Sequence, residues 1–148
     1  MKQTLPYWHE LPDLDLYLDQ VLLYVNQTTN SSELLEQKSL TASMINNYVK
    51  HKQIEKPIKK KYQKQQVARL IALTILKNVF SIQEISQTLH LLLQSSNSES
   101  LYNHFVDCMR DKENEKTPDI IRFACQSVKL YYKTRLLTME LERSYHES

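Results

Sequence analysis

The sequence contains no glycine at all among its 148 residues. Loops that cradle a phosphate are built from glycines, because a residue without a side chain lets the backbone amides approach the ligand. Dinucleotide-binding G-x-G-x-x-G loops, Walker loops and G-x-S-x-G nucleophile elbows are therefore excluded. Turns with a positive φ angle are expected to fall on asparagine or to be avoided. The composition favours helices.

Cysteine is also scarce, and the chain has no long apolar run. No stretch approaches the roughly 18 apolar residues that a transmembrane helix needs, so no contact with a membrane is expected. The N-terminal MKQTLPYWHELPDLD lacks the apolar central region of a signal peptide. These absences predict a cytoplasmic protein in which Cys108 and Cys125 are reduced thiols.

The sequence offers little for catalysis or metal binding. His104 and Cys108 are four residues apart on an expected helix, which is a spacing that can hold a metal ion, and Cys125 could join them. A buried cysteine near a surface histidine is the simpler interpretation of this pattern. No set of residues for acid–base chemistry stands out, so neither an enzymatic activity, nor a metal, nor a cofactor is expected.

Positive charge is concentrated in one short segment. Residues 50–64 hold seven lysines and one glutamate, a formal charge of +6, whereas the rest of the chain carries −4. A localised charge of this kind is the electrostatic footprint expected of a surface that meets a polyanion.

Apolar periodicity and capping signals divide the chain into helices. They are expected over 14–26, 33–38, 43–51, 63–78, 81–93, 101–112 and 119–145. The N-cap signals are Asp13, Thr41, Ser81 with Glu84, and Thr117 with Pro118. The helix over 63–78 is nearly encircled by apolar residues and should be the most buried. The fold class is therefore mainly all-α.

The helix over 43–51 has two distinct sides. One side is expected to face the core and gathers Met44, Ile45, Tyr48 and Val49. The opposite, polar side gathers Ser43, Asn46, Asn47 and Lys50. Pro57 then stops the helical pattern, and the IKKKY that follows is short enough for a small β-ribbon.

The order of elements from Thr41 to Leu89 resembles the winged helix-turn-helix head of the mercury-resistance (MerR) type of transcription regulator. The matching positions are Thr41, Tyr48, Pro57, a basic wing over Lys59–Tyr62, and Phe80-Ser81 with Glu84-Ile85. The segments LYLDQV, LTASMINNYVK and KKKY resemble more closely a family of small Gram-positive bacterial proteins of unknown function that carries such a head. This resemblance covers residues 14–93.

The resemblance implies double-stranded DNA binding in transcriptional regulation, with a recognition helix over 41–52 and a very short β-wing over 56–62. Asparagine can pair bidentately with adenine in the major groove, and lysines neutralise phosphates. The candidate DNA-binding residues are Ser43, Asn46, Asn47, Lys50, Lys52, Lys56, Lys59, Lys60, Lys61 and Lys64. The alternative is a protein-interaction module that keeps the helix-turn-helix scaffold without binding DNA.

The chain is expected to consist of two structural regions. Residues 1–93 would form the winged head with its N-terminal helix, and residues 94–148 a helical C-terminal extension. The final helix carries an apolar stripe of Ile121, Ala124, Val128, Tyr131, Tyr132, Arg135 and Met139. MerR relatives pair through a long helix after the head, which implies a homodimer through this helix. The alternative is that the helix folds back and covers its own head.

Overall fold

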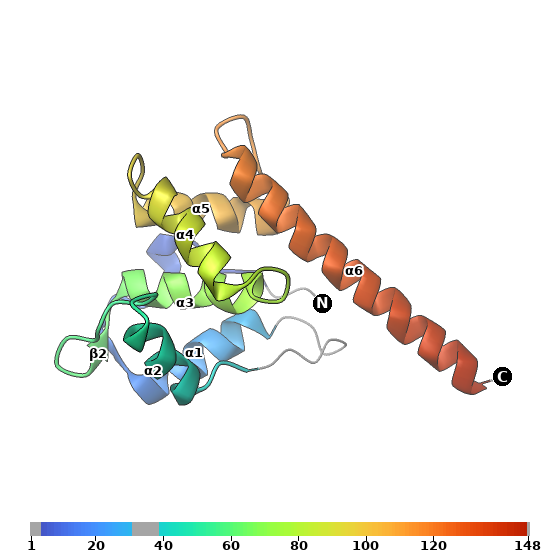
Figure 1. The fold of residues 1–148 in the computed structure, drawn as a ribbon, viewed down its shortest axis with the longest axis horizontal. Helices are drawn as coiled ribbons and strands as arrows, with labels where there is room; N and C mark the ends of the chain where they lie inside the picture. The colour runs from blue at the N-terminus through green and yellow to red at the C-terminus, as the bar shows by residue number, and fades with distance from the viewer. Residues whose placement is uncertain (1–3, 31–38, 148) are drawn as a thin grey trace.

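The computed structural model describes residues 4–30 and 39–147, and this part of the chain is mainly helical (Figure 1). The elements in chain order are the 3-10 helix η1 (Trp8–Glu10), β1 (Leu16–Tyr17), α1 (Leu18–Thr29), α2 (Ala42–Lys50), β2 (Lys61–Tyr62), α3 (Lys64–Leu76), α4 (Ile82–Leu92), α5 (Ser98–Met109) and α6 (Asp119–Glu147). The mainly α-helical class is therefore confirmed, while the helix expected over 33–38 lies outside the described residues. None of the described helices is both long and apolar enough to cross a membrane.

Helix α3 lies at the centre of the fold, as its encircling apolar residues predicted. Eight of its residues are buried, and Leu70 and Ile71 are completely inaccessible to solvent. The helix packs against α1, α4, α5 and α6. A single core cluster contains Ile71 together with Phe105 of α5 and Val128 of α6. The core is therefore shared by residues on both sides of position 93.

Helix α1 begins four residues later than predicted. Residues 16 and 17 are an extended strand, with Leu16 opposite Tyr62 and Tyr17 opposite Lys61 in an antiparallel pair. Asp13 is consequently not an N-cap, and Leu14 is 81% exposed instead of facing the core. The helical prediction failed here because the strand pairing depends on a partner far along the chain, which local periodicity cannot show.

Two of the predicted helix starts are confirmed. The Thr41 hydroxyl accepts a hydrogen bond from the Met44 backbone N–H at 3.1 Å. Ser81 and Glu84 form the reciprocal capping box, with distances of 2.9 and 3.1 Å. The Thr117 hydroxyl instead accepts from the Asn114 backbone N–H, so it closes the loop before α6 and does not cap the helix.

A tight hairpin turn joins Pro57 to β2. Ile58 and Lys61 each donate a backbone N–H to the other's carbonyl at 3.0 Å, which confirms the short ribbon. The two turn residues, Lys59 and Lys60, have φ angles of 52° and 68°, as a type I′ turn requires. The expectation that asparagine would take such positions is therefore wrong, because the described residues with positive φ are these two, Lys52 and Asp111.

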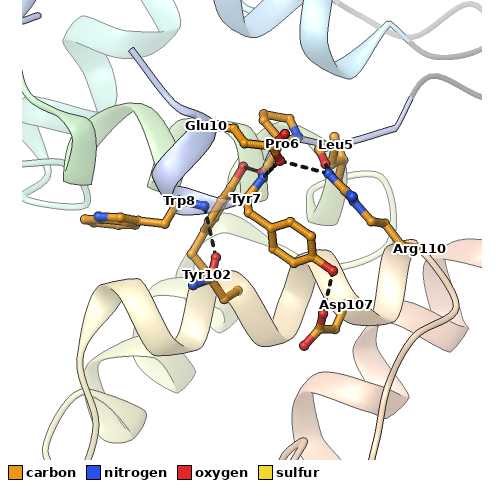
Figure 2. A network of polar contacts seen from close by, with 9 residues as sticks. Leu5, Pro6, Tyr7, Trp8, Glu10, Tyr102, Asp107 and Arg110 are labelled. Atoms are coloured by element: carbon orange, nitrogen blue, oxygen red, sulfur yellow. Dashed lines mark hydrogen bonds and ion pairs between the residues drawn. The ribbon is translucent and has the colours of Figure 1, made fainter. Parts of the chain in front are cut away.

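The N-terminal segment is fastened to α5 by a network of polar contacts (Figure 2). The Tyr7 hydroxyl donates to the Asp107 carboxylate at 2.7 Å, and the Tyr102 hydroxyl donates to the Pro6 carbonyl at 2.7 Å. The Arg110 guanidinium lies 4.1 Å from the centre of the Tyr7 ring and donates to the Leu5 carbonyl. Since these contacts join residues about a hundred positions apart, they close α5 onto the rest of the fold.

The residues of helix α6 that belong to the core lie in its first half. Its buried residues, Cys125 and Val128, belong to the core, and Ile121 and Tyr132 pack against that core from the same side. The C-terminal part of the helix extends away from the body (Figure 1, red). The first half therefore folds back onto the chain's own helices, whereas no residue beyond Tyr132 belongs to the core formed by the described residues.

Candidate nucleic-acid interface

The polar side of α2 is exposed, as predicted. Its four members are Ser43, Asn46, Asn47 and Lys50, and all of them are exposed. Within the described residues none of the four side chains makes a hydrogen bond or an ion pair. Their donors and acceptors are therefore available to a ligand, as reading the edges of base pairs requires.

The opposite side of α2 anchors the helix in the core. Ile45 is completely buried and Tyr48 is 6% exposed. Burial raises the pKa of Tyr48, since removing the hydroxyl from water disfavours the phenolate. The division of α2 into a core side and a polar side is therefore confirmed, which fixes the direction in which Asn46 and Asn47 point.

The loop after α2 is held in place by backbone hydrogen bonds to α2 and by a side chain of α3. The N–H groups of Gln53 and Ile54 both donate to the Tyr48 carbonyl, at 2.8 and 3.2 Å, and Ile54 is 1% exposed. The buried amide of Gln66 on α3 donates to the carbonyls of Glu55 and Lys56 at 2.8 and 3.1 Å. These contacts fix the path of the backbone that carries Lys52 and Lys56.

The lysines of the segment 50–64 differ in solvent exposure and in whether they have a partner within the chain. Exposed side chains are found at Lys50, Lys52, Lys56, Lys59 and Lys60. The other two are only half-exposed and have partners within the chain. The Lys61 ammonium lies 5.2 Å from the centre of the Tyr17 ring, and the Lys64 ammonium pairs with the Asp13 carboxylate at 2.9 Å.

One cation next to α2 was missed by sequence reasoning. The Lys77 ammonium lies 4.0 Å from the Met44 sulfur, which brings a positive charge from the end of α3 to the side of α2. The two residues are 33 positions apart, and their proximity depends on how α2 packs. No local pattern in the sequence could have indicated it.

The two cysteines and His104 do not form a metal site in this structure. Among the described residues, no group of three or more histidine, cysteine and acidic side chains is arranged to hold a metal ion. Cys108 and Cys125 are buried, free thiols, and burial raises the pKa of both. A protonated, buried thiol is a packing residue, because the thiolate is the form that binds metals and reacts.

A family model described as "Domain of unknown function (DUF1836)" matches residues 6–105, a range that includes α2, the hairpin and every candidate DNA-binding residue. Neither a curated protein nor a solved structure matches the chain.

Proposed function

The chain belongs to the DUF1836 family of domains of unknown function, and from this premise we propose that the protein binds double-stranded DNA as a regulator of transcription. The observation that carries the proposal is the outward side of α2, where two adjacent asparagines and a lysine are exposed without partners among the described residues. Helix α2 would lie in the major groove, with Asn46 or Asn47 on an adenine and Lys50 nearby.

Strain in the lysine segment supports the proposal. Lys52, Lys59 and Lys60 all have left-handed backbone conformations, which cost a residue with a side chain about 1–2 kcal/mol. Glycine or asparagine would fit these positions better. Strained residues tend to occur where function requires them, and a lysine at the tip of a hairpin is well suited to reach a phosphate.

The finer fold assignment is part of the same proposal. Helix α2 would be the recognition helix of a MerR-like winged head, and the hairpin at Lys59 and Lys60 its very short wing. The pairing of β2 with β1 supports this assignment, because it gives the hairpin a fixed base. Since Lys61 and Lys64 already have partners in the chain, the phosphate contacts would come mainly from Lys52, Lys56, Lys59 and Lys60.

The test is the salt dependence of binding to genomic DNA fragments, measured by fluorescence anisotropy. Four phosphate contacts correspond to a slope of about −3 to −4 in a plot of log K against log salt. Asn46→Ala or Asn47→Ala, whichever side chain contacts the adenine, should weaken binding to a selected site by about 1–3 kcal/mol while leaving random DNA nearly unaffected. A protein that fails to bind DNA at low salt would instead favour an interaction module on the same scaffold.

We also propose a homodimer through α6, with its interface on the side away from the core. The apolar stripe from Ile121 to Met139, which the sequence predicted as the dimer interface, is partly used within the chain. Its members Ile121, Val128 and Tyr132 pack in or against the chain's own core. The side facing away carries a second apolar stripe, the outer stripe, of Ile120, Phe123, Leu130, Leu137 and Leu141, all exposed. Sedimentation of the double variant Leu130→Glu, Leu137→Glu tests this, because neither side chain belongs to the core. The wild type should sediment as a dimer and the variant as a monomer in which the helices of the core remain folded.

A further inference from the structure

A pocket of about 630 Å³ lies between α3, α4, α5 and α6. This volume is within the roughly 300–1,000 Å³ of sites for small molecules. The lining is almost entirely apolar and includes Ala72, Leu76, Ile85, Leu89, Phe105 and Phe123. The lining residues of α3 run from Gln65 to Leu76, a distance of roughly 16 Å along the helix axis. The pocket is therefore long and suits an elongated apolar molecule.

Helix α4 forms one wall of the pocket without being buried itself. None of its residues is buried, although Ile82, Ile85, Leu89 and Leu92 have the spacing of a core-facing stripe. Ile85, Leu89 and Leu92 line the pocket and remain half-exposed. Protein interiors are normally filled to the density of organic crystals. Ile82 and Ile85 also pack against the core. At Leu89 and Leu92 the apolar side of α4 thus faces a space that the described residues do not fill.

One positively charged side chain faces this space without a hydrogen-bond acceptor among the described residues. Arg69 lines the pocket from α3 and makes no hydrogen bond or ion pair with the described residues. Burial lowers its pKa, and only the charge of Glu55 acts in the opposite direction. Glu84, which also lines the pocket, already accepts the Ser81 backbone N–H. A half-buried guanidinium in apolar surroundings attracts an anion, preferably a planar carboxylate that it can bind bidentately.

We propose that this pocket binds an elongated apolar carboxylic acid, with the carboxylate on Arg69 and the chain running between α4 and α6 towards Leu76. The long apolar part of the site matches the hydrocarbon chain of such a molecule. Arg69, the cation that lines the pocket within the described part of the chain, matches its carboxylate. The inference does not depend on DNA binding, since none of the candidate DNA-binding residues lines the pocket.

Laurate, kept below its micelle concentration, is the probe, and titration calorimetry with the full chain is the measurement. Dodecanol has the same chain length without the charge and serves as the control ligand. Arg69→Met removes the charge and keeps much of the apolar side chain. It should weaken laurate binding by about 10-fold to 100-fold and leave dodecanol binding unchanged. The matched variant Arg135→Met removes an exposed charge that is outside the pocket lining and should change neither affinity.

A second variant tests the position of the chain. Ala72→Phe fills the pocket from α3 and should abolish binding of both probes, while circular dichroism checks that the fold is kept. The proposal is overturned if wild-type protein does not bind laurate saturably, or if Arg69→Met binds laurate as well as the wild type does. Ile120 and Phe123 belong both to the pocket lining and to the outer stripe. Laurate binding seen only in the monomeric Leu130→Glu, Leu137→Glu variant would therefore assign the pocket to a second copy of the chain and also overturn the proposal.

Discussion

The strained hairpin provides the sharpest test of why lysines occupy it. Changing Lys59→Asn and Lys60→Gly together installs the residue pair that a type I′ turn prefers. The left-handed conformation costs about 1–2 kcal/mol at each lysine, and the double variant relieves this cost. Glycine offsets about 0.4–1 kcal/mol of the stabilisation, because it increases the conformational entropy of the unfolded chain. At φ angles of 52° and 68°, glycine avoids the whole cost of the left-handed conformation and asparagine only part of it, so the free energy of unfolding should rise by about 1–2 kcal/mol. For a chain of this size the expected increase in Tm is roughly 2–8 °C.

The same double variant should bind DNA more weakly. Two lost phosphate contacts reduce the slope of log K against log salt by about 2, which fluorescence anisotropy on genomic fragments measures alongside urea unfolding. Replacing both lysines with glutamine separates the two effects, because glutamine removes the charge and keeps the strained side chain. That control should lose the same DNA affinity without gaining stability. An Asn-Gly variant that is no more stable than the wild type would refute the argument from strain, and unchanged DNA affinity would refute the role of the hairpin.

Other substitutions test the contacts that position α2. Gln66→Met should lower the free energy of unfolding by about 1–3 kcal/mol, because the carbonyls of Glu55 and Lys56 lose their donor; urea unfolding measures this. Tyr48→Ala should cost about 3 kcal/mol in the same assay through lost packing, and Thr41→Ala about 1 kcal/mol through the lost N-cap. Burial raises the pKa of both Cys108 and Cys125 above the ordinary thiol value, so at neutral pH iodoacetamide should label them only after unfolding, as mass spectrometry would show.

Short-range features were predictable from the sequence. The two sides of α2 follow from helical periodicity alone, and the burial of Tyr48 opposite the exposed Asn46 bears this out. The capping box of Ser81 and Glu84 needs only a four-residue pattern, and the structure contains it. Such features depend on neighbours within one or two turns, so the sequence carries the whole signal.

Features that depend on distant partners were not predictable in this way. The strand at Leu16 and Tyr17 exists because it pairs with Tyr62 and Lys61, and locally it reads as the beginning of a helix. The lining of the pocket comes from four helices and from Phe80 between α3 and α4, and none of the four helices shows a distinctive pattern by itself. One signal was available, since Arg69 interrupts a helix that is otherwise nearly encircled by apolar residues. A charged side chain on a helix surrounded by apolar residues needs either an oppositely charged or hydrogen-bonding partner or contact with solvent.

Helix α6 shows why periodicity alone could not decide between the two interpretations of the final helix. It carries two apolar stripes on opposite sides, and at about 100° per residue both have helical spacing. The stripe through Val128 is used within the chain, while Phe123 and Leu137 on the outer stripe are 57% and 59% exposed. Folding back and pairing are therefore compatible, because each uses a different side. Isolated helical segments are marginal in water, so the half beyond Tyr132 is expected to lose helicity in any variant that prevents pairing.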